Sequence, residues 1–182
     1  LLEKVDDKWN MVDWPENLRD GYDFPLTLPV GEGCHNVINA FYVGCVMKTE
    51  EIKRILNISY EERGSELCRA FNDEFFNKET GLYVDRKNST HSAVHSNILP
   101  AFFGICDAEN QDSVANYLIE RGMCCGVYMA YFFLKALCRM GRYEDAYSFI
   151  VSESDRSWYN MVREGATTCF EAWGKEQKWN TS

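Results

Sequence analysis

The sequence of 182 residues is long enough to form one sizeable hydrophobic core, and its apolar content of 46% is too high for a disordered chain. The formal net charge of −9 argues against nucleic acid as a partner, because proteins that bind nucleic acid carry a basic footprint. No apolar run in the sequence is long enough to span a bilayer, so we expect no membrane partner.

Apolar residues recur at three- and four-residue steps along most of the chain, which is the spacing of amphipathic helices. Residues 36–57 form the first long stretch of this kind. Ser59 and Glu62 then have the spacing of a capping box, which predicts the start of a second helix with an apolar stripe over 67–75. Residues 82–85 favour a short extended piece. The remaining predicted helices cover residues 92–103, 111–121, 126–140, 143–151 and 158–163.

Pro100 lies inside the predicted helix 92–103, where its missing N–H predicts a kink or a break. Gly122 and Gly141 occupy positions typical of helix C-terminal caps. Helices of roughly ten to twenty residues joined by short turns, with almost no strand pattern, predict an all-α fold of helical hairpins. We find no boundary that would divide the chain, so we expect a single helical domain over residues 1–182.

The eight cysteines do not form a metal or disulfide pattern. Only Cys124 and Cys125 are neighbours, and the sequence has no Cys-x-x-Cys pair or Cys/His cluster at zinc spacing. His91 and His95 are four residues apart, but Ser92 stands where a zinc protease has its glutamate. We therefore expect no metal and no other cofactor. Unpaired thiols favour a reducing compartment such as the cytoplasm.

The segment GATTCFEAW, residues 165–173, is the most informative in the chain. It sets one acidic group, Glu171, between the rings of Phe170 and Trp173. Aromatic faces stack on pyranose rings while a carboxylate handles a proton, so this combination suits sugar chemistry. Considered without its context, Glu171 is better explained as an acid at the start of an amphipathic helix, where the helix dipole stabilises it.

The sequence of this segment, together with SWYNM at residues 157–161, resembles the C-terminal catalytic signature of bacterial α-L-rhamnosidases. Further blocks resemble the same family in the same order. They are DWPENLRDGYDF at 13–24, NAFY at 39–42, TGLYVD at 80–85 and HSAVHSN at 91–97. Each block alone is moderately specific, and their common order makes coincidence a poor explanation.

The resemblance implies a catalytic (α/α)6 toroid barrel, of which the helices predicted here make up roughly half. It implies an inverting glycosidase, in which Glu171 is the general base and a second carboxylic acid protonates the leaving oxygen. The family's general acid lies in an Asp-Cys-Pro-x-Arg-x-Glu type of segment, and nothing in this chain matches it. We therefore expect the general acid to lie outside this chain, which would be a barrel fragment without activity of its own.

The resemblance also implies that the 13–24 loop faces the active mouth, where carboxylates, a guanidinium and rings provide the contacts that sugar hydroxyls need. Each residue also has a structural alternative. Asp13 could cap a helix, Trp14 and Trp173 could belong to the core, and His95 could satisfy a backbone carbonyl. The predicted substrate contacts are Asp13, Trp14, Arg19, Asp20, His95 and Trp173.

The expected partner is a rhamnose-containing glycoside or oligosaccharide, whose terminal α-L-rhamnose would be removed. A half-barrel would also expose apolar helix faces, so we expect self-association. Two other functions stay open. One is a different (α/α) barrel glycosidase, such as an unsaturated glucuronyl hydrolase. The other is a non-catalytic helical module that binds a sugar or a protein.

The scattered placement of the cysteines predicts that the protein carries no intramolecular disulfide. All eight thiols should react with a thiol reagent in denaturant without prior reduction. The mass of the unreduced protein should equal that of the fully reduced chain. A stable mass deficit that disappears on reduction would contradict this expectation.

Overall fold

The computed structural model describes residues 1–2, 12–13, 16–23 and 34–175, and the structural statements below concern these residues. Within them the regular secondary structure is almost entirely helical, which confirms the predicted fold class. The helices are α1 (Asn36–Ile55), α2 (Gly64–Phe75), α3 (Val94–Phe103), α4 (Gln111–Arg121), α5 (Val127–Arg139), α6 (Tyr143–Ile150) and α7 (Trp158–Arg163). Two 3-10 turns, η1 (Glu16–Leu18) and η2 (Ala108–Asn110), and a two-stranded hairpin of β1 (Phe76–Asn77) and β2 (Leu82–Tyr83) complete the described elements.

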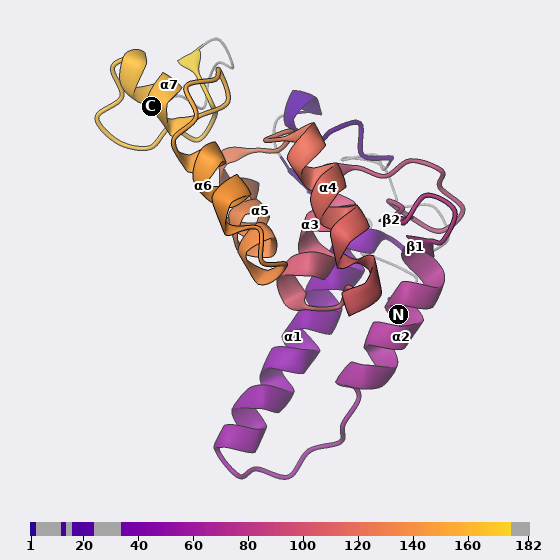
Figure 1. The fold of residues 1–182 in the computed structure, drawn as a ribbon. Helices are drawn as coiled ribbons and strands as arrows, with labels where there is room; N and C mark the ends of the chain where they lie inside the picture. The colour runs from indigo at the N-terminus through magenta and orange to yellow at the C-terminus, as the bar shows by residue number, and fades with distance from the viewer. Residues whose placement is uncertain (3–11, 14–15, 24–33, 176–182) are drawn as a thin grey trace.

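The first six helices form three consecutive hairpins, arranged as two rows (Figure 1). Helix α3 packs against α1 on one side and α5 on the other, so the odd-numbered helices form a continuous row. Each even-numbered helix packs against the helix before it. The central helix is the most buried, since every residue from Val94 to Ala101 is buried. That the whole chain forms one domain stays a prediction.

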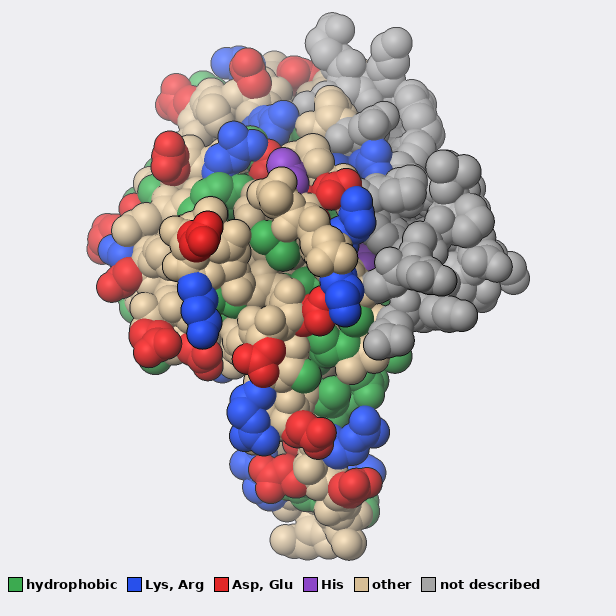
Figure 2. Space-filling model, turned by 90° about the vertical axis from the view of Figure 1, so that its right-hand side faces the viewer, with side chains coloured by type: hydrophobic (Ala, Val, Ile, Leu, Met, Phe, Trp, Pro, Cys, Tyr) green, Lys and Arg blue, Asp and Glu red, His purple; other side chains and the backbone are tan. Residues whose placement is uncertain are grey.

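The α1–α2 hairpin projects beyond the other helices (Figure 1). Acidic and basic side chains intermingle over its surface (Figure 2), and the Lys48 ammonium lies 2.7 Å from the Glu51 carboxylate there. At its tip Ile55 and Leu56 are exposed. Among the described residues, no helix is long and apolar enough to cross a membrane.

Of the kink or break expected at Pro100, the break does not occur, because α3 continues through Pro100 to Phe103, and a kink there stays a prediction. A proline at this position cannot donate the backbone hydrogen bond that the Ser96 carbonyl would receive in an unbroken helix. The side-chain amide of Asn36 takes its place, donating to the Ser96 oxygen at 3.3 Å. A residue sixty positions earlier therefore compensates the missing donor, which no local pattern reveals.

The predicted capping box at Ser59 and Glu62 is also wrong, because α2 begins only at Gly64. The backbone N–H groups of Arg63 and Gly64 donate to the Glu50 carboxylate at 2.7 and 2.9 Å. Glu50 belongs to α1, so the first turn of α2 is capped across the hairpin. This acid also has the sign of charge that a helix N-terminus favours.

A buried polar network fixes the start of α1. Tyr22 donates its hydroxyl proton to the Asp85 carbonyl oxygen at 2.8 Å, and the backbone N–H of Val37 donates to the Tyr22 oxygen at 3.2 Å. The His35 Nδ1 lies 2.7 Å from the same oxygen. The single hydroxyl proton of Tyr22 is used in its hydrogen bond to the Asp85 carbonyl. In the contact between His35 and Tyr22, His35 is therefore assigned as the donor, through Nδ1–H. Burial lowers the pKa of His35 to about 3.

This shift makes stability depend on pH. His35 stays neutral in the folded protein, whereas in the unfolded chain it gains a proton as pH falls through about 6.5. The unfolded state then binds more protons, so the stability present above pH 6.5 is lost on acidification. Between pH 7.5 and pH 5 His35 should account for a loss of about 2 kcal/mol.

Urea denaturation at both pH values checks this prediction. The His35→Gln variant keeps a donor but cannot titrate, so its loss of stability over this range should be about 2 kcal/mol smaller than that of the parent. Equal losses in the two proteins would contradict the assignment of a buried neutral imidazole.

Candidate functional site

Glu171 emerges from a buried segment that follows α7. The helix ends before Gly165, and residues 166–174 form bends without a helix. Phe170, Ala172 and Trp173 are buried, whereas Glu171 between them is exposed. The interpretation of Glu171 as an acid in the first turn of a helix therefore does not hold. Its carboxylate makes no hydrogen bond or ion pair to any described residue, so it is available to solvent and to a substrate.

Trp173 anchors this segment to the body of the protein. Its indole N–H donates to the carbonyl oxygen of Cys125 at 2.7 Å, and its ring meets Trp158 edge to face with 5.2 Å between centroids. The side-chain amide of Asn160 donates to the Trp173 carbonyl at 3.1 Å. Trp173 itself has no exposed surface. These contacts fix the backbone two residues after Glu171.

Asp13 and His95 meet next to Cys125, the residue that Trp173 contacts, at the turn formed by Cys125 and Gly126. One oxygen of the Asp13 carboxylate accepts a hydrogen bond from the Gly126 backbone N–H at 2.6 Å and lies 2.8 Å from His95 Nε2. A Cβ at position 126 would collide with the other carboxylate oxygen, so the close approach requires glycine. The structure therefore brings Asp13, His95 and Trp173 together around Cys125 and Gly126.

Both members of the Asp13–His95 pair are covered. The Asp13 side chain is 8% exposed and His95 is fully buried, with no hydrogen-bond partner for its Nδ1 among the described residues. Burial raises the pKa of the neighbouring Cys125 thiol well above its usual value, and the charge of Asp13 acts in the same direction. Cys125 therefore stays protonated and does not serve as a nucleophile.

Asp20 lies at the start of α3, next in sequence to the buried Arg19. The backbone N–H of Val94 donates to one Asp20 oxygen at 2.9 Å, and Arg121 pairs with the other. The Asp20 side chain is 3% exposed, and Arg19 is buried as well. Trp14, the remaining predicted contact, lies outside the described residues.

Asp85, the last residue of the block TGLYVD, is a buried polar centre near the start of α3, and the sequence analysis assigned it no role. Its carboxylate accepts from the backbone N–H groups of Asp23 and Ala93 at 2.8 and 2.7 Å and from the Ser96 hydroxyl at 2.6 Å. His91 Nδ1 lies 2.6 Å from it. These donors come from separate segments, so no spacing in the sequence marks Asp85, which merely follows a short apolar run.

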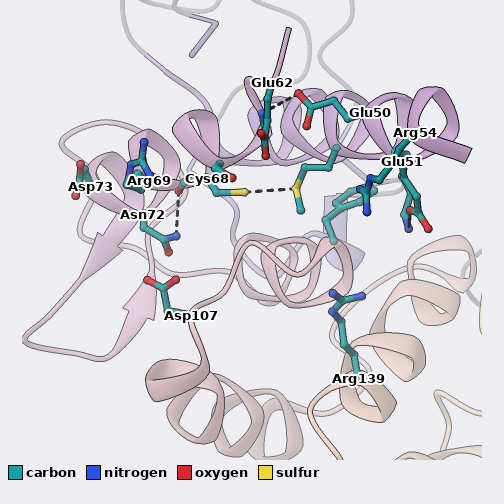
Figure 3. Close-up of a pocket in the computed structure, with 15 residues that line it drawn as sticks. Glu50, Glu51, Arg54, Glu62, Cys68, Arg69, Asn72, Asp73, Asp107 and Arg139 are labelled. Atoms are coloured by element: carbon teal, nitrogen blue, oxygen red, sulfur yellow. Dashed lines mark hydrogen bonds and ion pairs between the residues drawn. The ribbon is translucent and has the colours of Figure 1, made fainter. Parts of the chain in front are cut away.

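The candidate site lies at the N-terminal end of α3, where Asp20 and Asp85 accept hydrogen bonds from backbone N–H groups. A separate cavity of about 780 Å3 lies between α1 and α2 (Figure 3). Its lining includes Phe103, at the opposite, C-terminal end of α3. Negative carboxylates and positive guanidinium groups line that cavity together. In the described ranges no group of three or more His, Cys, Asp or Glu residues is placed to hold a metal ion.

Comparison with known proteins identifies a family and solved structures of similar fold. A family model described as the bacterial α-L-rhamnosidase 6 hairpin glycosidase domain matches residues 2–182. The α-L-rhamnosidase of Streptomyces avermitilis, solved in complex with L-rhamnose, has a similar structure, with a TM-score of 0.67 and 14% sequence identity. The match covers 98% of this chain and 17% of that enzyme. The comparison with curated proteins found no match. At this identity the structural likeness concerns the fold.

Asp85→Asn should destabilise the protein by about 2–4 kcal/mol, because the amide group turns one acceptor into a donor that faces buried donors. Asp112→Asn is the matched control, since Asp112 pairs with Arg142 at 2.9 Å with its side chain 89% exposed. The control should change stability by no more than about 0.5 kcal/mol. Urea denaturation of both variants provides the measurement, and equal effects would show that the Asp85 network is not structurally important.

Proposed function

The chain belongs to the family of bacterial α-L-rhamnosidase six-hairpin glycosidase domains, and on that premise we propose that it contributes the general base to an enzyme that removes terminal α-L-rhamnose with inversion. The part of the chain that the structure describes forms three helical hairpins, half of the six in the family's description. The chain spans 17% of the length of its structural relative, so further parts of such an enzyme would supply the remaining machinery. That relative was solved with L-rhamnose bound, which supports a rhamnose-containing substrate.

Glu171 is the proposed base, and one observation carries the assignment. It is the single exposed residue in the buried run 170–174, and Trp173 anchors this run through its indole N–H and its backbone carbonyl. An exposed carboxylate on an anchored backbone suits a base, which must reach a water molecule beside the anomeric carbon and hold its position there.

The general acid is proposed to lie outside this chain. In inverting glycosidases the two carboxyl groups stand roughly 6.5–9.5 Å apart, with the sugar and the attacking water between them. The other carboxylates at this end, Asp13, Asp20 and Asp85, are buried and accept hydrogen bonds from backbone N–H groups. Because they are covered and already engaged by the backbone, these groups are poorly placed to reach a leaving oxygen.

The buried residues around the Cys125–Gly126 turn have a supporting role in this proposal. Asp13 and His95 hold the turn from one side, and Trp173 binds it two residues from Glu171. A shift of this turn would move the base, and misplacement by about 1 Å is enough to reduce turnover strongly. Direct sugar contact by Asp13, Trp14, Arg19, Asp20, His95 and Trp173 stays a prediction.

The proposal predicts that Glu171→Gln, in an enzyme that contains this chain, lowers turnover of an aryl α-L-rhamnoside by about 10²–10⁴-fold. The amide keeps the shape of the side chain but cannot accept the proton of the attacking water. Glu153→Gln, which changes an exposed acid before α7, is the control and should leave turnover unchanged.

Azide distinguishes a missing base from a general loss of structure, because this anionic nucleophile needs no proton acceptor. Azide should restore turnover in Glu171→Ala and yield the β-rhamnosyl azide, the inverted product. Unchanged turnover in Glu171→Gln would move the base elsewhere. Failure of the intact parent enzyme to cleave any rhamnoside would favour a different barrel glycosidase or a non-catalytic module.

A further inference from the structure

A second cavity, of about 410 Å3, opens at the C-terminal ends of α3 and α5, at the end of the helix row opposite to Glu171. Its volume is within the range of small-molecule sites in proteins. The lining combines aromatic and cationic side chains from α1, α3, α5 and α6. Those that matter here are Phe102, Phe103, Tyr131, Lys135, Arg139 and Tyr143.

The aromatic side chains form a connected wall. Phe102 meets Phe103 with 4.9 Å between ring centroids and Tyr131 with 6.0 Å, both in edge arrangements. Tyr131 is 58% exposed and Tyr143 is 65% exposed. A flat ligand that enters the cavity therefore finds packed phenylalanines and the accessible faces of two tyrosines.

The charges of the lining are all positive, in a chain whose net charge is −9. Lys135 and Arg139 stand four residues apart on one face of α5, and neither pairs with a carboxylate among the described residues. Like charges at this spacing repel each other. A third cation, Lys48, is already neutralised by Glu51. Lys135 and Arg139 thus place positive charge beside the aromatic wall without a paired carboxylate among the described residues, and Arg139 also lines the larger cavity, which contains acidic side chains.

Gly104 determines where the Arg139 guanidinium lies. A Cβ at position 104 would collide with the Arg139 Nη2, and the backbone of Gly104 has φ +77°, which side-chain-bearing residues rarely adopt. The guanidinium therefore lies close against the turn that ends α3, where it lines the cavity.

We propose that this cavity binds a small, flat aromatic anion, such as an arene carboxylate or arene sulfonate. The rings would stack on Tyr131 and Tyr143, and the anionic group would bridge Lys135 and Arg139. An acidic sugar fits less well, because no carboxylate or carboxamide side chain lines the cavity to accept hydrogen bonds from its hydroxyls. The inference does not rest on the proposed glycosidase activity.

Calorimetric titration of the chain with naphthalene-2-sulfonate tests the proposal. We expect saturable binding at one site that weakens in high salt, because the contact depends on charge. The neutral 2-naphthol and a naphthylmethylammonium salt should bind at least about tenfold more weakly, a difference that charge reversal across two cations readily produces. Galacturonate should bind more weakly than the sulfonate as well.

Variants of exposed residues locate the site without disturbing the fold. Lys135→Gln and Arg139→Gln should each weaken sulfonate binding about fivefold, the effect of one exposed ion pair. Lys53→Gln, which removes a charge outside the lining, should have no effect. Tyr131→Leu should weaken binding, whereas Tyr128→Leu, one turn earlier on α5 and 76% exposed, should not.

Four results would overturn the proposal. They are an absence of sulfonate binding at millimolar concentration, equal binding of the neutral analogue, tighter binding of galacturonate, and equal effects of the lining variants and their controls. Because every arm measures binding, these results are independent of whether Glu171 acts as a base.

Discussion

The buried carboxylate of Asp85 is the constraint on which this structure most depends. A charge removed from water is tolerated only where hydrogen bonds replace those of the solvent, and Asp85 obtains these bonds from several parts of the chain. Its backbone carbonyl also accepts from Asn36 at 2.9 Å and from the Tyr22 hydroxyl. One residue therefore joins the loop before α1, the start of α1 and the start of α3. Loss of this centre would release the segments that hold the candidate site.

The same demand for hydrogen bonds separates the carboxylates of this end by role. Asp13, Asp20 and Asp85 each accept backbone N–H groups and are covered, so they hold structure in place. Glu171 has no such partner in the described residues and is exposed. A base must combine a fixed backbone with a free carboxylate. Among the acids considered at this end, Glu171 alone meets both conditions, and this supports its proposed role more directly than the surrounding motif does.

The amino-acid sequence predicts the helices well because their apolar spacing is local. The spans 111–121 and 158–163 were predicted with the boundaries that α4 and α7 have. The predictions that failed depend on contacts between residues that are far apart in the sequence. Asn36 compensates Pro100 from another helix, and Glu50 caps α2 from α1. Asp85 escaped notice because its donors meet only in the folded chain. At the candidate site, the motif pointed to Glu171, but not to the turn at Gly126 that joins Trp173 to Asp13.

One electrostatic rule accounts for the contrast between the two ends of the helix row. Helix N-termini favour negative charge and C-termini favour positive charge. Asp20 binds the first turn of α3, and Asp13 binds Gly126 immediately before α5, so carboxylates gather where these helices begin. Arg139 lies in the last turn of α5 and rests on Gly104 after α3, where both helices end. Since the helices carry this polarity themselves, the packing of α3 against α5 gathers structural carboxylates at one end of the row and cations at the other.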